Sequence, residues 1–109
     1  MKNIEKVKEL TLIEFNEFIK EDFVLIDFSA EWCMPCLMMT PIIEKLSEKF
    51  QGKIKFGKIN VNENQDLVRK YNVSSIPNFT LLKNGKIVEQ FIGSCSSEEF
   101  GEKLKKFLE

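Results

Sequence analysis

Two cysteines, Cys33 and Cys36, stand three positions apart where a strongly apolar stretch meets a segment with helical periodicity. The apolar stretch, Phe23–Phe28, has the composition of a strand that is buried on both faces. Met34–Phe50 has apolar residues at helical spacing. Free amide groups and the dipole at a helix N-terminus favour a negative charge, and the thiolate is the reactive form of cysteine. The spacing therefore predicts a redox-active pair, with Cys33 readily ionised and Cys36 within reach for a disulfide.

Two prolines fall in this region. Pro35 suits the first turn of a helix, where spare amide groups mean that proline loses no hydrogen bond. Pro41 lies further along, and its ring conflicts with the preceding turn, so we expect a kink there. Both prolines are compatible with one long helix.

Composition limits the classes of function. The 109 residues suit one domain spanning 1–109, and 43% hydrophobic with 30% charged residues is ordinary for a globular protein. Sixteen basic and seventeen acidic residues give a net charge of -1, without the basic footprint of a nucleic-acid or membrane-surface binder. No apolar run approaches the roughly 20 residues of a membrane helix, and the start resembles no secretory signal. We expect a cytoplasmic monomer that binds neither nucleic acid nor membrane.

The cysteine count leaves a metal alternative open. Three cysteines do not make a disulfide framework, and the chain has no histidine to act as a base or ligand. A zinc or iron–sulfur site needs four ligands. A metal- or cluster-binding module would therefore require two chains to share Cys33 and Cys36. Cys95 is an extra thiol, either incidental or, as a minority interpretation, regulatory or dimer-forming.

Hydrophobic periodicity predicts the remaining elements. Expected strands are Ile4–Leu10, Phe23–Phe28, Lys53–Val61, Phe79–Leu82 and Ile87–Ile92. Expected helices are one that begins at Thr11 with Leu12, Phe15, Phe18 and Ile19 on one face, Met34–Phe50, Asn64–Tyr71 and one that begins at Ser96. The order is β-α-β-α-β-α-β-β-α. It predicts an α/β fold with a mixed five-stranded sheet and helices on both faces.

Local signals fix several boundaries. Thr11 with Glu14, and Ser96 with Glu99, have the spacing of capping boxes. Asn62, with Gln65 three residues later, is expected to cap the third helix. The Asn84-Gly85 pair between the last two strands is a strong hairpin signal, because both residues tolerate positive φ.

Together these features resemble the thioredoxin family over essentially the whole chain. The matching residues are Val24–Phe28, Ala30–Cys33, Pro35, Cys36, Pro41, Lys58, Ile76, Pro77, Lys83–Gly85 and Gly93. The resemblance implies the thioredoxin fold and a dithiol-disulfide oxidoreductase that reduces disulfides in client proteins. Such an enzyme carries electrons in redox homeostasis and is recycled by thioredoxin reductase or an equivalent donor. It needs no bound cofactor, because the cysteines carry the electrons.

Cys33 is the expected nucleophile, and Cys36 then releases the mixed disulfide. An aspartate within the apolar stretch, Asp27, is expensive to bury unless it is used or paired. Under the second helix near Cys36 it would have a raised pKa, and we hypothesise that it takes the Cys36 proton through a water. Alternation puts Lys58 on the face of Ile54, and the resemblance makes Asp27 its partner. The alternatives are a turn aspartate and a lysine that reaches solvent.

The resemblance also implies a client-binding surface. The Ile76–Pro77 bond would be cis, with the Ile76 backbone free to pair with an extended client segment and Pro77 keeping metal from the thiols. Without the family, an ordinary strand-start proline is the better interpretation. The expected substrate-binding residues are Trp32, Met34, Pro35, Ile76, Pro77, Ile92 and Gly93. Packing in the core is the alternative for Trp32.

The chain departs from the family at three positions. Met34 replaces the usual glycine, Leu37 stands where a basic residue is common, and Asn78 replaces a threonine. Met34 leaves open a glutaredoxin-like protein or a dithiol oxidant, because residues between the cysteines help to set the reduction potential. A scaffold of the same fold that serves only for docking is a further alternative.

Overall fold

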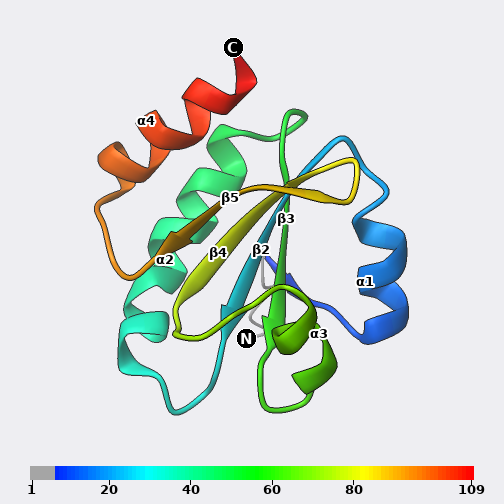
Figure 1. Cartoon of the computed structure of the whole chain (residues 1–109). Helices are drawn as coiled ribbons and strands as arrows, with labels where there is room; N and C mark the ends of the chain where they lie inside the picture. The colour runs from blue at the N-terminus through cyan, green and yellow to red at the C-terminus, as the bar shows by residue number, and fades with distance from the viewer. Residues whose placement is uncertain (1–6) are drawn as a thin grey trace, which may run out of the picture.

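The computed structural model describes residues 7–109, and these form an α/β fold in the predicted element order (Figure 1). The strands are β1 (Lys8–Glu9), β2 (Phe23–Ser29), β3 (Lys55–Asn60), β4 (Asn78–Lys83) and β5 (Lys86–Ile92). The helices are α1 (Leu12–Phe18), α2 (Met34–Lys49), α3 (Gln65–Lys70) and α4 (Ser97–Leu108). Pro41 lies within α2 without ending it.

The strands form one mixed five-stranded sheet in the order β1-β3-β2-β4-β5. β1, β3 and β2 are parallel, and β4 and β5 continue the sheet antiparallel. The apolar stretch predicted to be a buried strand is β2, and it occupies the centre. Asn84 and Gly85 have φ values of 52° and 82°, so the predicted hairpin turn between β4 and β5 is confirmed.

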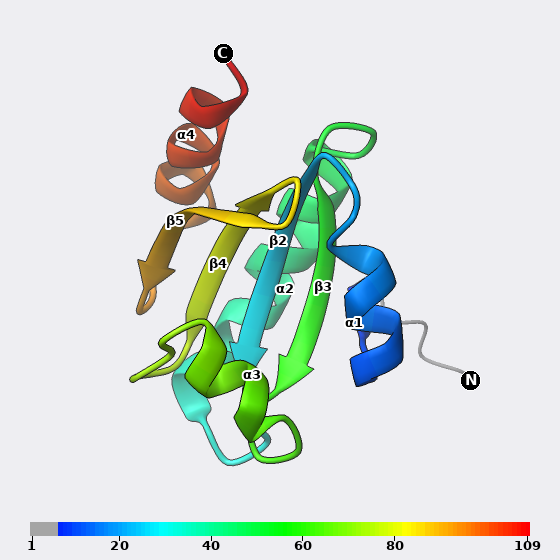
Figure 2. The ribbon, with the colours of Figure 1, turned by 45° about the vertical axis from the view of Figure 1, so that its right-hand side comes forward.

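Helices cover both faces of the sheet, as the sequence predicts (Figure 2). On one face α2 and α4 pack against the sheet around Leu25, Met39 and Phe100. On the other, α1 and α3 pack around Ile26 and Phe15. Burial of each such side chain contributes roughly 1.5–3 kcal/mol. Successive side chains of β2 point to opposite faces of the sheet, so they pack alternately into two separate cores.

The capping box predicted at Thr11 forms completely, and the one predicted at Ser96 forms only in part. At Thr11 both halves of the capping box form, with the Thr11 side chain and the Glu14 carboxylate each accepting a backbone N–H. Ser96 accepts from the Glu99 amide, but the Glu99 carboxylate lies 3.5 Å from Lys103 Nζ and forms an ion pair there instead.

The predicted Asn62 cap is wrong. The N-cap residue of α3 is Asn64, whose side chain makes no cap hydrogen bond. Its amide donates instead to the Asn60 carbonyl, and the Asn62 amide donates to the Asn60 side chain. The asparagines fold the loop between β3 and α3.

Two predictions near the N-terminus change. The first strand is shorter than expected: β1 contains Lys8 and Glu9 only, and positions 4–6 of the prediction lie outside the described residues. Leu12 is 49% exposed rather than packed with Phe15, because it opens α1 at the sheet edge. None of the helices in residues 7–109 is long and apolar enough to cross a membrane.

Candidate active site

A disulfide joins Cys33 to Cys36 at the start of α2, with their Cα atoms 5.3 Å apart. Cys33 is the N-cap residue, and its sulfur accepts a hydrogen bond from the Cys36 amide at 3.2 Å. Pro35 lies in the first turn, as expected. The predicted position of the pair is therefore confirmed, and a backbone N–H and a helix dipole both favour a thiolate on Cys33.

The disulfide is nearly buried but lies beside exposed apolar side chains. Cys33 and Cys36 are 5% and 3% exposed, and they pack with Ala30 and the partly buried Ile76. Trp32, by contrast, is 67% exposed, so the alternative that it packs in the core is wrong. The apolar side chain of Trp32 is thus exposed next to the Cys33 sulfur in the chain.

The loops that the sequence singled out meet next to the pair. The Ile76–Pro77 bond is cis, as the resemblance implies. The Pro77 carbonyl accepts a hydrogen bond from the Gly93 amide at 3.0 Å, and Gly93 has a φ of 91°. Ile92, just before it, is 60% exposed. The structure thus brings the loop after α3 and the end of β5 together at one edge of the site.

Asp27 lies opposite Lys58 in the parallel register of β2 and β3. It is 3% exposed in the central strand, so the turn alternative is wrong. Burial raises the pKa of Asp27 to about 7, and the positive charge of Lys58 opposes this rise. Within residues 7–109, the buried Oδ1 atom of Asp27 has no hydrogen-bond partner. The carboxyl therefore changes protonation near neutral pH.

Lys58 and Cys36 both line a small cavity of about 70 Å³, whereas Asp27 is not among its lining residues. Ser29, Thr40 and Asn60 contribute polar groups to its lining. A polar space of this size can hold a water. Such a water would lie between Cys36 and Lys58, the residue in register with Asp27.

Sequence reasoning missed a polar network on the opposite face of the sheet. Gln90 donates to the Tyr71 carbonyl at 2.8 Å and to the Thr80 hydroxyl at 3.1 Å, and Thr80 donates to Asn78 at 2.8 Å. Asn78 and Thr80 are fully buried. The only sequence signal is a polar residue at alternate positions of an otherwise apolar strand. The network ties β4 and β5 to the C-terminus of α3, from which the Ile76–Pro77 loop departs.

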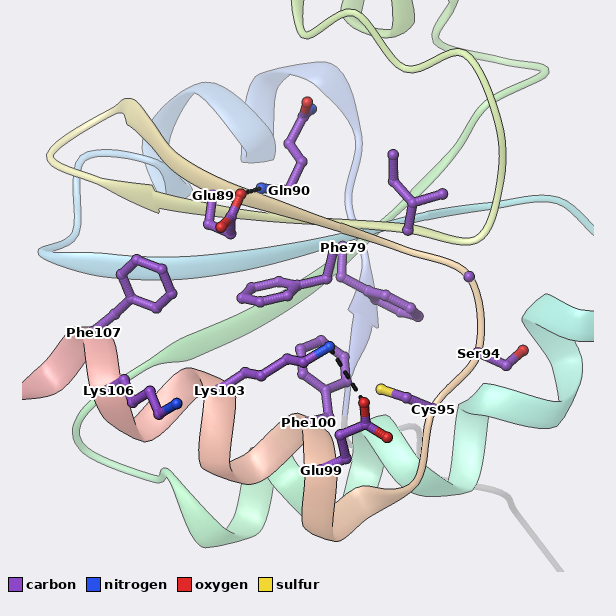
Figure 3. Close-up of a pocket in the computed structure, with 13 residues that line it drawn as sticks. Phe79, Glu89, Gln90, Ser94, Cys95, Glu99, Phe100, Lys103, Lys106 and Phe107 are labelled. Carbon is purple, nitrogen blue, oxygen red and sulfur yellow. Dashed lines mark hydrogen bonds and ion pairs between the residues drawn. The ribbon is translucent and has the colours of Figure 1, made fainter.

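A second cavity, of about 470 Å³, lies between β5 and α4 (Figure 3). Phe79, Phe100 and Phe107 form much of its apolar lining, and Figure 3 shows the Cys95 sulfur directed into it. Cys95 is a free thiol, and burial raises its pKa. This thiol therefore differs from the Cys33–Cys36 pair in both position and electrostatics.

Among residues 7–109, no three cysteine or carboxylate side chains gather where they could hold a metal ion. The arrangement that is present is a cysteine pair at a helix N-terminus, a buried carboxyl on the strand before it and a proline loop beside it. This fold and this pair define a dithiol-disulfide oxidoreductase.

Comparisons with known proteins identify the family. The family model described as Thioredoxin matches residues 6–106. Thioredoxin from Bacillus subtilis is 42% identical over 94 residues, which cover 86% of this chain and 90% of that protein. The oxidised thioredoxin of Plasmodium falciparum superposes with a TM-score of 0.84 at 31% identity, covering 94% of this chain and 99% of that one. A mutant thioredoxin from Halobacterium salinarum NRC-1 also gives 0.84, at 32% identity, covering 94% and 90%.

The chain belongs to the thioredoxin family. It is a protein-disulfide reductase whose electrons are carried by the Cys33–Cys36 pair, as in the family, without a bound cofactor. Proteins that contain disulfides are its substrates, and a reductase supplies its electrons, in the general sense that the family implies.

Proposed function

We propose that the protein is a general reductase of client disulfides in which Cys33 attacks and Cys36 completes the transfer. In the dithiol form, the Cys33 thiolate forms a bond to one client sulfur, and the client S–S bond breaks. The other client sulfur leaves as a thiolate and takes up a proton. Cys36 then loses its proton and attacks Cys33, which releases the second client thiolate and re-forms the Cys33–Cys36 disulfide. Two electrons pass from the dithiol to the client.

The observation that carries this assignment of roles is the hydrogen bond from the Cys36 amide to the Cys33 sulfur at the N-terminus of the 16-residue helix α2. A donor and a dipole aimed at one sulfur favour that sulfur as the thiolate. Cys36 lacks this N-cap position and lies deeper, at 3% exposure. It therefore suits the second, internal attack.

Asp27 is the proposed base for Cys36, and Lys58 adjusts its pKa. A base works best when its pKa lies near the working pH, and that of Asp27 is raised to about 7. The cavity lined by Cys36 and Lys58 has room for a water, and the proposed transfer runs through that water past Lys58, which is in register with Asp27. Lys58 lowers the pKa of Asp27, which keeps more of the carboxylate in its base form at neutral pH.

The client is proposed to bind over Trp32, Ile76 and Ile92. Its segment next to the disulfide would pair with the Ile76 backbone as an added strand, beside Pro77 and Gly93. Exposed apolar side chains beside a reactive sulfur fit varied unfolded or partly folded clients. The sequence supports a cytoplasmic setting, because an unpaired Cys95 accompanies the redox pair. There the protein would shuttle electrons from thioredoxin reductase or an equivalent donor.

The proposal is tested by redox titration of the pair against glutathione and dithiothreitol series, together with insulin reduction by dithiothreitol. We expect a reducing potential and turnover that is lost in Cys33→Ser but kept in Cys95→Ser, the matched control. A potential typical of an oxidant, or dependence on glutathione, would favour the oxidant or glutaredoxin-like alternative. Bound metal or visible absorbance in the pure protein would favour the shared-metal alternative, and absence of turnover the docking scaffold.

A further inference from the structure

Helix α2 has a second apolar side, which points into solvent. Its buried side chains include Met39 and Ile43. On the outside, Met34, Leu37 and Met38 are 65%, 50% and 69% exposed. Their spacing, at positions i, i+3 and i+4, places them next to one another along one side of the helix. We call these three residues the α2 stripe.

The segment that carries the α2 stripe has no charged residue of its own, although Glu9, Glu31 and Lys58 line the cavity beside Leu37. Between Glu31 and Glu44 the sequence has no charged residue, although 30% of the whole chain is charged. The exposed side of a helix is ordinarily charged or polar. At Gly101 of α4 the nearest α2 atoms belong to Leu46 and Lys49, in the later part of α2, whereas the α2 stripe near its start is exposed. An uncovered apolar side of this kind marks an interaction surface.

The α2 stripe begins at the redox pair. Met34 lies between Cys33 and Cys36 in the chain, and Leu37 follows Cys36 directly and lines the small cavity beside it. The surface is therefore continuous with the place where a client disulfide must sit, but it extends along the helix, away from the Ile76–Pro77 loop.

We propose that the α2 stripe binds apolar residues that flank the client disulfide, and so selects clients with an apolar flank. This inference rests on the proposed function. A second copy of the chain is the less suitable occupant, because Met34 to Met38 spans only about 6 Å of helix, at about 1.5 Å per residue. A stable dimer needs roughly 800 Å² from each partner. Any occupant of the α2 stripe also lies against the disulfide, as a client must.

The test compares two peptide disulfides that differ only in the residues beside the cysteine, one with leucines and the other with glutamines. Both peptides are uncharged beside the cysteine, so their long-range electrostatic attraction to the protein is equal. The variant is Met38→Gln, which keeps side-chain length, charge and helix propensity close to the original and leaves Leu37, which lines the cavity beside Cys36, in place. The matched control is Ile13→Gln, at a residue that is 79% exposed on α1. The small disulfide of 2-mercaptoethanol has no flanking residues, so its rate of reduction reports on the redox chemistry alone.

We expect the protein to reduce the leucine peptide with a kcat/KM about tenfold above that for the glutamine peptide, as burial of apolar surface predicts. Met38→Gln should bring the ratio closer to one, through KM, with an unchanged reduction potential and an unchanged rate on the small disulfide. Ile13→Gln should keep the original ratio.

Equal kcat/KM values for the two peptides, with normal reduction of the small disulfide, would overturn the inference alone. Failure to reduce either peptide or the small disulfide would instead overturn the proposed function. The inference is also wrong if sedimentation shows a dimer that Met38→Gln dissociates, because the α2 stripe would then bind a second copy.

Discussion

Asp27 and Lys58 face each other across the parallel β2–β3 register, yet the buried Oδ1 atom of Asp27 accepts no hydrogen bond from residues 7–109. Burial without a full set of partners is the main cause of its raised pKa of about 7, and the charge of Lys58 opposes it. A carboxyl held in this way costs stability when it is ionised. The folded state therefore favours the protonated form of Asp27 more strongly than the unfolded chain does.

The first prediction concerns stability against pH. The pKa of Asp27 is about 7 in the folded protein against an ordinary value of 3.8, so the folded state binds the proton more tightly. Stability due to this group therefore falls as pH rises from about 4 to 7, by roughly 4 kcal/mol in all. Asp27→Asn removes this loss. We expect the variant to be more stable at pH 8 by up to roughly that amount and nearly unchanged at pH 4.

Denaturant unfolding of the oxidised protein at both pH values measures this effect. Asp22→Asn, a change at an exposed carboxyl, is the control and should follow the original protein at both. If Asp27→Asn and the original protein have the same free energy of unfolding at pH 8, the ionised Asp27 carboxylate does not lower stability as described above.

The second prediction concerns the resolving step. As the base for Cys36, Asp27 must be ionised, so release of the mixed disulfide should speed up as pH rises through about 7. Asp27→Asn should remove this inflection and slow release at pH 8 by at least about tenfold. Lys58→Met should move the midpoint to higher pH, because loss of the positive charge raises the pKa of Asp27.

Single-turnover reaction of the dithiol form with a peptide disulfide can be followed through Trp32, the one tryptophan of the chain, which adjoins Cys33. Attack by Cys33 and release by Cys36 then appear as separate phases. An inflection near 7 that survives in Asp27→Asn would assign it to another group.

The third prediction separates the thiols of the reduced protein. Cys33 has a backbone donor and a helix N-terminus at its sulfur, whereas burial raises the pKa of Cys95 and the charge of Lys103 only partly opposes this rise. Limited iodoacetamide at pH 7 should therefore alkylate Cys33 first, at least about tenfold faster than Cys95. Peptide mapping by mass spectrometry locates the label, and Cys95→Ser should leave the fast phase intact. Faster labelling of Cys95 would remove the basis for Cys33 as the nucleophile.

Much of this architecture could be predicted because its signals are local. The Thr11 capping box and the Asn84-Gly85 turn are each encoded within four residues, and the apolar stretch of β2 needs only its own composition. The pair at the start of α2 is predictable for the same reason, since its chemistry depends on spacing alone. Only the resemblance to the family predicted Lys58 as the partner of Asp27, because no local sequence signal links the two residues.

The features that could not be predicted depend on which segments meet. Asn62 has a capping spacing, but Asn60 and Asn64 bond to each other first, and that choice depends on where β3 ends. Leu12 fits the apolar side of α1 by period but lies beyond the edge of the core. The partners of Gln90 come from two other elements, so its role follows only from the strand register.

The fourth prediction tests that network. Gln90→Leu would leave the Tyr71 carbonyl and the Thr80 hydroxyl without their donor, which should lower the free energy of unfolding by about 1–3 kcal/mol. Because Tyr71 ends α3 and the Ile76–Pro77 loop follows it, we expect KM for a peptide disulfide to rise while the rate on a small disulfide stays the same.

Lys86→Leu, at an exposed position of the same strand, is the control for the change to leucine and should alter neither quantity. Gln90→Glu is the second variant, since its side chain keeps the shape of glutamine but cannot donate to the Tyr71 carbonyl when ionised. It should therefore share the KM defect at pH 8. A loss of stability without any change in KM would mean that the network supports the sheet alone, and that the Ile76–Pro77 loop holds its position without it.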